Sequence, residues 1–127
     1  MAPTVDPGQI VIMRAGYYRE HPPQRGDIVI FLAPPEGHHW IKRVIGLPGE
    51  NIAIDDGVVL IDGRKLTEDY LAAENVTTDY SRQMPAQKVP PDSYFLLGDN
   101  RDNSEDGRLL GATHRDDLIG KVVTILK

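Results

Sequence analysis

Residues 98–108, GDNRDNSEDGR, contain four carboxylates, two arginines, two asparagines and one serine, Ser104, in eleven consecutive positions. A plain surface turn needs only a glycine and one Asp or Asn. Oxygen-bearing side chains at alternate positions from Asp102 onward follow the first half of a calcium-loop pattern, but the twelfth position is Thr113, where that loop requires a bidentate Glu. We therefore interpret the segment as a hydrogen-bonded, salt-bridged loop and keep a calcium site as the weaker alternative.

A second stretch that could do chemistry is WIKRVIGLPG, residues 40–49. Side chains alternate between the two faces of a strand, so Lys42 shares a face with Trp40 and Val44, while Arg43 lies on the other. Burial among apolar neighbours would lower the pKa of the lysine amine. At an ordinary pKa of about 10.4, only about one lysine in two thousand is neutral at pH 7, so such a depression would create a usable general base. Alternation alone leaves open the alternative that Lys42 extends its amine into water.

Several other kinds of chemistry are excluded or disfavoured. The 127 residues include no cysteine, which excludes disulfides, a thiol nucleophile and a cysteine-based zinc site. His38 and His39 are neighbours that would point to opposite faces of a strand, and His21 and His114 have no ligand spacing to them, so we interpret all four as structural or exposed. The net charge of −5 argues against a nucleic-acid partner.

The candidate residues must be positioned by a β-rich scaffold. Short apolar runs bounded by Gly, Pro and Asp predict strands at residues 9–14, 27–32, 40–45, 51–54, 58–61, 94–97 and 120–126. We therefore expect a mainly β fold, with compact folded-over or barrel-like antiparallel sheets and little helix. The length favours a single domain over residues 1–127.

The middle of the chain carries fewer strand signals. Aspartate–glycine pairs indicate tight turns in a small β-hairpin region at about 50–66. A helix of about two turns is expected at residues 68–74. Residues 75–91, which include three prolines, are expected to form a long connection.

No apolar run approaches the roughly 20 residues that span a bilayer. The first residues also lack the charged region and apolar stretch of a signal peptide. Apolar residues at 1–5 and 31–35 are compatible with a membrane-facing patch and equally with ordinary core, and the pattern leaves both open.

Four segments, taken in order, resemble the characteristic boxes of type I signal peptidases, the membrane-anchored serine proteases that remove signal peptides. They read MAPT at 1–4, RGDIVIF at 25–31, IKRVIGLPG at 41–49 and GDNRDNSEDGR at 98–108, and a GKV strand follows at 120–122. The likeness spans essentially the whole chain, and the third and fourth boxes are the most specific. It implies a mainly β fold of the signal peptidase I type.

The resemblance also implies roles for individual residues. Lys42 matches the general base of a Ser/Lys dyad, and Ser104 matches the serine that orients its amine. Such a base must be uncharged to accept a proton, and it must lie within hydrogen-bond reach of its nucleophile. Residues matching structural support are Arg43, Asp99, Arg101, Asp106 and Arg108, with Asp106 and Arg108 as a salt-bridged pair and Asp99 and Arg101 shaping the same turn.

Two positions depart from the family pattern. The family's nucleophilic serine directly precedes the first box, so we expect it before Met1; the 127-residue chain lacks it and is predicted to be inactive as given. Gly107 stands where many members carry serine, a change expected to cost little because that serine is not the one that orients the base.

The family's substrates are preprotein signal peptides, bound as an extended strand and cut after Ala-X-Ala-like residues. The residues that match the lining of that site are Met1, Pro3, Trp40 and Ile41, with Trp40 in a place often held by tyrosine. The resemblance implies no cofactor, no metal and no nucleic acid. It implies an upstream transmembrane helix that anchors the protein in the cell membrane, with the catalytic domain on the extracytoplasmic side.

Three alternatives stay open beside an endopeptidase. Two belong to the same chemical class, a pilin-processing peptidase and a self-cleaving repressor, and both also use Ser/Lys chemistry. The third is a non-catalytic domain that binds extended peptides without cutting them. A serine codon directly before Met1, preceded by about twenty apolar codons, would favour the protease over this binding domain.

Overall fold

The computed structural model describes residues 1–34 and 37–126, which form mainly antiparallel strands. The strands are β1 Ile10–Ala15, β2 Ile28–Ala33, β3 His38–Gly46, β4 Asn51–Asp55, β5 Val58–Ile61, β6 Arg64–Lys65, β7 Gln83–Lys88, β8 Ser93–Leu97, β9 Thr113–His114 and β10 Leu118–Leu126. The helices are α1 Asp79–Arg82 and α2 Gly107–Leu110, and the 3₁₀ turns are η1 Tyr17–Arg19, η2 Ala73–Asn75 and η3 Arg115–Asp117.

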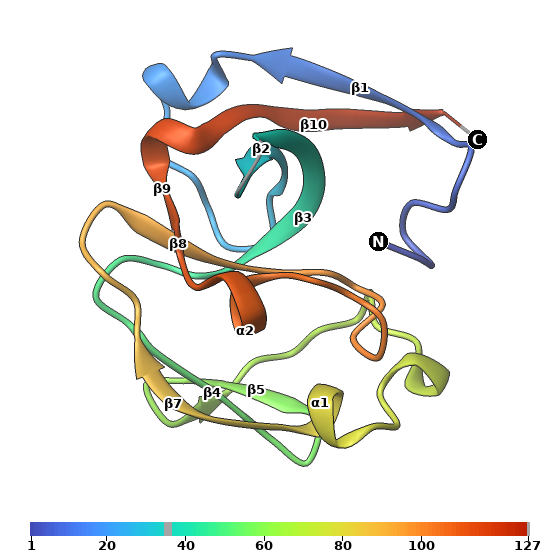
Figure 1. The fold of residues 1–127 in the computed structure, drawn as a ribbon, viewed down its shortest axis with the longest axis vertical. Helices are drawn as coiled ribbons and strands as arrows, with labels where there is room; N and C mark the ends of the chain where they lie inside the picture. Colours follow the sequence, from blue (N-terminus) through green and yellow to red (C-terminus); the bar gives the residue numbers. More distant parts are fainter. Residues whose placement is uncertain (35–36, 127) are drawn as a thin grey trace.

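The strands form two sheets, stacked one above the other in Figure 1. The larger sheet has the order β1-β10-β2-β3-β8-β9, and the smaller has the order β6-β5-β4-β7. In Figure 1, β1, β10, β2 and β3 occupy the upper half, β4, β5 and β7 the lower half, and β8 runs between them. The mainly β fold expected from the sequence is confirmed.

Strands β3 and β8 lie between two hydrophobic cores. Val44 of β3 and Leu96 of β8 are paired and pack into the core on the side of β2, while Ile45 and Leu97 pack into the core on the side of the smaller sheet. Successive residues of a strand point to opposite faces, so one pair of strands can serve both cores. This central position gives the end of β3 and the loop after β8 a rigid support.

All seven strands expected from the sequence are present, with ends displaced by at most two residues. The β4–β5 hairpin turns through Asp56 and Gly57, whose φ angles of 50° and 81° suit a two-residue type I′ turn. The expected helix at 68–74 is wrong: that segment contains only the start of η2, and its side chains turn toward the loop after β8. Residues 83–88, inside the stretch expected to be a connection, form β7 and pair with β4.

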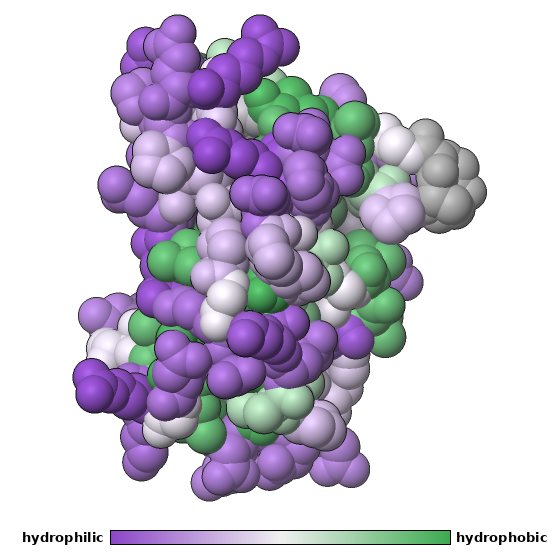
Figure 2. Space-filling model, turned by 90° about the vertical axis from the view of Figure 1, so that its left-hand side faces the viewer, coloured by the Kyte–Doolittle hydropathy of each residue, from purple (hydrophilic) through white to green (hydrophobic). Residues whose placement is uncertain are grey.

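Figure 2 shows hydrophilic residues over most of one face of the molecule, with hydrophobic residues in several separate groups. Within β2, Phe31 and Ala33 are buried and Leu32 is exposed, so the first part of the apolar stretch at 31–35 is largely core; Pro35 lies outside the described residues. Exposed apolar side chains gather instead on the β1–β10 pair, at Ile10, Ile12, Val123 and Leu126. Among the described residues, no helix has the length and apolar character needed to cross a membrane.

Candidate active site

The amine of Lys42 and the hydroxyl of Ser104 meet where β3 approaches the loop that follows β8. Lys42 Nζ donates to Ser104 Oγ at 2.9 Å, Lys42 is partly buried, and Ser104 is buried. Burial lowers the pKa of the Lys42 amine, and the charge of Arg108 lowers it further; the charges of nearby carboxylates oppose the shift. The alternative in which Lys42 extends freely into water is therefore wrong.

Gly98 forms the floor beneath this pair. A Cβ at residue 98 would lie 2.1 Å from Ser104 Oγ and 3.3 Å from Lys42 Nζ, so no larger residue fits without displacing the serine. Asp106 accepts a hydrogen bond from the Gly98 N–H at 2.9 Å, and Arg101 Nε donates to the Gly98 carbonyl at 2.8 Å. Both backbone polar groups of Gly98, which lies beneath the Lys42 amine, are therefore held by hydrogen bonds.

Asp106 and Arg108 form the ion pair expected from the sequence. Their side chains make two hydrogen bonds of 2.8 and 2.7 Å, and both are nearly fully buried. The Arg108 guanidinium lies 4.1 Å from the centre of the Tyr80 ring, and the Tyr80 hydroxyl donates to the Ser104 carbonyl at 2.6 Å. The backbone and side chain of Ser104 are therefore both held in place.

Asp99 and Arg101, expected to shape the same turn, each pair with a residue outside it. Asp99 accepts hydrogen bonds of 2.9 and 2.7 Å from Arg43 of β3, and the pair is buried. Arg101 pairs instead with Glu68. The two residues thus connect the loop to two other parts of the chain.

The first residues of the chain lie against the same site. The Thr4 hydroxyl donates to Asp99 Oδ2, and the Asp99 N–H contacts Met1 Sδ at 3.4 Å. Burial, followed by the charge of Lys42, lowers the pKa of the Met1 amine. The charge of Lys42 therefore acts on the Met1 amine, and the first residues of the chain contact Asp99, which directly follows Gly98.

A shallow groove of about 290 Å³ lies beside β3. Trp40 and Ile41, two of the four residues matched to a substrate site, line it, whereas Met1 and Pro3 do not. Its other lining residues are Val5, Gln9, Val11, Met13, Ile30 and His39. Strand β3 pairs with β2 from His38 to Arg43 but with β8 only from Arg43 onward, so its other edge at residues 39–42 has no strand partner among the described residues.

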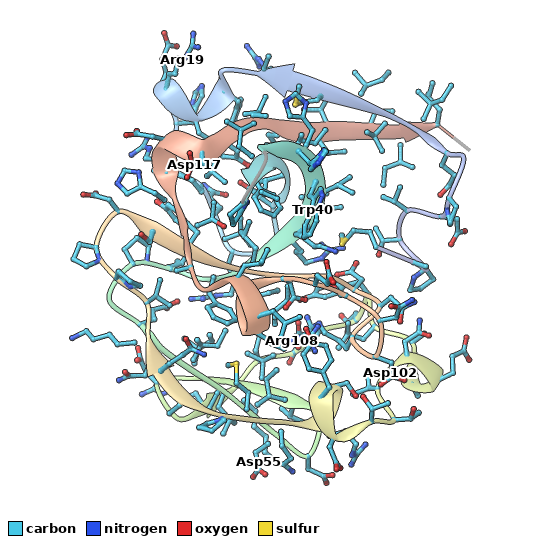
Figure 3. All side chains as sticks on the ribbon, in the orientation of Figure 1. Arg19, Trp40, Asp55, Asp102, Arg108 and Asp117 are labelled. Atoms are coloured by element: carbon cyan, nitrogen blue, oxygen red, sulfur yellow. The ribbon has the colours of Figure 1, made fainter. Side chains whose placement is uncertain are left out.

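Figure 3 shows Trp40 on β3 above the β8 ribbon, and Arg108 and Asp102 below it. Asp102 does not point toward Ser104; it accepts hydrogen bonds from the backbone N–H groups of Thr77 and Thr78 at 2.8 and 3.0 Å. With Asp106 engaged by Arg108, the calcium interpretation of this loop is not supported. Among residues 1–34 and 37–126, no group of three or more potential ligand side chains is arranged to hold a metal ion.

Sequence reasoning missed four residues that contact the site. Thr4 lies within a recognised box but had no assigned role, and Glu68, Tyr70 and Tyr80 lie in segments expected to be a helix and a connection. The signal available in residues 68–74 was a carboxylate and a phenol two positions apart, Glu68 and Tyr70. Of the histidines, His21 stacks on Tyr17, and the side chain of His114 caps η3.

Comparisons with known proteins give one consistent result. The family described as "Signal peptidase, peptidase S26" matches residues 1–127. A signal peptidase I of Leptolyngbya laminosa is 40% identical over 131 residues, covering 97% of this chain and 62% of that protein. A probable signal peptidase I-1 of Synechocystis is 37% identical, covering 94% and 63%. The chain thus spans about three-fifths of the length of these two relatives.

The fold has a close counterpart of known structure. The crystal structure of a signal peptidase I from Enterococcus faecalis superposes with a TM-score of 0.72 at 38% sequence identity. The match covers 82% of this chain and 98% of that one. At this level of identity, the likeness extends beyond the bare fold to the sequence.

Proposed function

Because the chain belongs to the signal peptidase S26 family, we propose that it forms the catalytic domain of a type I signal peptidase, a serine endopeptidase that removes signal peptides from exported preproteins. The observation that carries the proposal is the short contact of 2.9 Å between Lys42 Nζ and Ser104 Oγ, in a site where the first residues of the chain contact Asp99. An amine with a lowered pKa, held by a hydroxyl next to the chain position that the family's serine occupies, is suited to activating that serine.

In the proposed reaction, the nucleophile is a serine directly before Met1. Neutral Lys42 Nζ accepts the proton of its hydroxyl while the serine oxygen bonds to the scissile carbonyl carbon. The ammonium then returns its proton to the leaving nitrogen, the C–N bond breaks, and the signal peptide remains as an ester on serine. Lys42 next accepts a proton from water, whose oxygen bonds to the ester carbon. The ammonium then returns this proton to the serine oxygen as the ester C–O bond breaks, and the signal peptide leaves with a free carboxyl group. Ser104 keeps the amine directed at the reacting atoms throughout.

The substrate would add as an extended strand along residues 39–42 of β3, whose edge on the side of β8 is unpaired among the described residues. The groove lined by Trp40 and Ile41 lies beside this edge, and we propose that it receives side chains of the bound peptide, which the family cuts after Ala-X-Ala-like residues. Met1 and Pro3 are proposed to complete the lining on the side of the nucleophile.

The place of action proposed for the full protein is the extracytoplasmic side of the cell membrane, with an anchoring helix upstream. Exposed apolar side chains on the β1–β10 pair support contact with a membrane surface, because a scattered surface residue would not produce such a group on two adjacent strands. Substrates still inserted in the lipid would then reach β3 directly.

The test compares three proteins on a fluorogenic peptide containing an Ala-X-Ala cleavage site: the 127-residue chain, the chain extended by Ser before Met1, and the chain extended by Ala. We expect turnover only with the serine extension, and labelling of that serine by an acylating inhibitor. A folded Ser-extended protein that binds the peptide without cutting it would contradict the peptidase and favour the peptide-binding alternative. Equal turnover by the Ala extension would exclude the proposed nucleophile.

A further inference from the structure

Residues 68–70 belong to no strand or helix, but Glu68 and Tyr70 contact two arginines of the site. Taking Lys42 as the general base of the proposed function, we propose that Glu68, together with Tyr70, is a positioning residue that fixes the floor beneath the Lys42 amine. Neither side chain touches Lys42 in the described contacts; both act through the arginines that hold the site.

Glu68 reaches the floor through Arg101. Its carboxylate accepts hydrogen bonds of 2.6 and 3.2 Å from the Arg101 guanidinium, and both side chains are almost completely buried. The remaining Nε–H of Arg101 donates to the Gly98 carbonyl at 2.8 Å. Because Gly98 lies directly against Ser104 and near Lys42, a shift of Arg101 would move the surface on which the amine rests.

Tyr70 connects this arginine to the second one. The Tyr70 hydroxyl donates to Glu68 at 2.5 Å, and the Arg43 guanidinium lies 3.7 Å from the centre of the Tyr70 ring. Arg43 is paired with Asp99, the residue directly after Gly98. Residues 68 and 70 therefore hold the Gly98–Asp99 segment from two directions.

A purely stabilising role explains this arrangement poorly. Removing two charges from water is unfavourable, and a buried pair is weak evidence of a net gain in stability. What a buried, doubly hydrogen-bonded pair does provide is a fixed geometry for Arg101. A general base needs such a geometry, because its amine must stay dry and within hydrogen-bond reach.

If Glu68 acted on Lys42 only through its charge, its removal would shift the pKa of Lys42 in one direction; if Glu68 fixes the floor, its removal would shift the pKa in the other. The groups that face its amine are Asp106, Arg108, Glu105 and Asp99, together with the Met1 amine. Loss of the Glu68 charge would leave Arg101 as an unpaired cation nearby and, if the floor stayed in place, would lower the pKa of Lys42. If the floor loosens, water reaches the amine and its pKa rises toward the ordinary value. The direction in which the pKa of Lys42 shifts in a Glu68 variant therefore distinguishes a loss of charge alone from a loosening of the Gly98 floor.

The experiment titrates Lys42 by NMR in the 127-residue chain with ¹³C-labelled lysine, using Lys42→Arg to assign the resonance. In Glu68→Gln we expect the pKa of Lys42 to rise. In the Ser-extended protein we expect kcat to fall by about tenfold, a part of the 10²–10⁴-fold that general-base catalysis supplies, with KM within twofold. An unchanged or lowered pKa in folded Glu68→Gln overturns the proposal.

Two further variants complete the test. Asp56→Asn removes the exposed Arg82–Asp56 pair and should leave both the Lys42 titration and kcat unchanged. Tyr70→Phe keeps the ring beside Arg43 but loses the bond to Glu68; it should shift Lys42 in the same direction by less, and it decides the question if Glu68→Gln does not fold. An unshifted Lys42 in Tyr70→Phe would then overturn the proposal. Because the titration needs no substrate, absence of peptidase activity would refute the proposed function alone.

Discussion

Lys42 Nζ and Ser104 Oγ lie 2.9 Å apart although the two residues are separated by 62 positions in the chain. The contact forms because β3 pairs with β8, whose last residue, Leu97, faces Arg43 and leads directly into the loop that carries Ser104. The serine backbone is held by Tyr80, and its side chain rests on Gly98. The position of the amine is therefore a property of the whole loop and not of one hydrogen bond.

We expect Ser104→Ala to lower kcat of the Ser-extended protein by about 10²-fold or more, within the range that general-base catalysis contributes. The variant leaves Lys42 without its described hydrogen-bond partner, so the amine samples more orientations and meets more water. KM should change little, because Ser104 is buried. Steady-state kinetics on the fluorogenic peptide measure both constants.

The matched control for this variant is Ser93→Ala. Ser93 is also buried, and its hydroxyl makes one described hydrogen bond, to the Pro91 carbonyl at 3.2 Å. Its removal should leave kcat nearly unchanged. Similar losses of activity in both variants would indicate general destabilisation instead of a role in orienting Lys42.

A second prediction concerns stability and pH. The pKa of Lys42 is lower in the folded protein than in the unfolded chain, so between these two values the unfolded state binds more protons and stability increases with pH. Stability is therefore lost as the pH falls from above the ordinary lysine pKa toward the folded one. Lys42→Met removes this dependence.

The free energy of unfolding of the two proteins, measured in urea at a series of pH values, gives the difference directly. We expect the wild type to lose stability relative to Lys42→Met as the pH decreases through that window, and to show a constant difference below it. Groups that do not interact with Lys42 titrate alike in both proteins, and their contributions cancel. A difference independent of pH throughout would mean that Lys42 is fully hydrated.

The sequence predicted the parts of the site that depend on local pattern. Alternation along β3 correctly separated Lys42 from Arg43, because a strand imposes that geometry whatever surrounds it. Asp106 and Arg108 were recognised as a pair, and they are only two residues apart. The separation of Lys42 from Arg43 follows from strand geometry, and the Asp106–Arg108 pair was implied by the resemblance to a known family.

The contacts that were missed join distant residues. Glu68 pairs with Arg101 across 33 positions, and Thr4 donates to Asp99 across 95. An acidic residue carries no local signal of which arginine it will meet, because that depends on how the two sheets are stacked. The helix expected at 68–74 also gave Glu68 no role. In the structure, residues 68–72 form no helix, and Glu68 contacts Arg101 in the loop after β8.

Gly107 provides a third prediction, on folding. A Cβ at this position would lie 2.9 Å from the Phe95 ring and 3.0 Å from the Leu96 carbonyl oxygen. Gly107→Ser, although it introduces a residue common at this place in the family, should therefore destabilise this protein by about 1–3 kcal/mol, as overpacking of a core does. Thermal or urea unfolding measures the change. Ala86→Ser, at an exposed position of β7, is the control and should be nearly neutral; a Gly107→Ser protein as stable as the wild type would show that Phe95 moves aside freely.

The fourth prediction concerns Thr4, which ties the first residues of the chain to the buried Arg43–Asp99 pair. Thr4→Val keeps the shape of the side chain and removes the hydroxyl, so Asp99 retains Arg43 while residues 1–4 keep only the weaker contact between Met1 Sδ and the Asp99 N–H. The stability cost should be about 1 kcal/mol, the usual value for one hydrogen bond. The activity cost should be larger, because a displacement of about 1 Å at the nucleophile can reduce the rate by about 10²-fold.

Kinetics and unfolding of Thr4→Val and Thr4→Ser, both in the Ser-extended protein, separate these two effects. Thr4→Ser restores a hydroxyl donor to Asp99 and should recover most of the activity, since only the tether and not the methyl group is needed. The pKa of Lys42 should stay the same in both variants, because its floor is formed by Gly98 and not by Thr4. If Thr4→Val lost activity only in proportion to its loss of folded protein, Thr4 would have no part in aligning the nucleophile with the base.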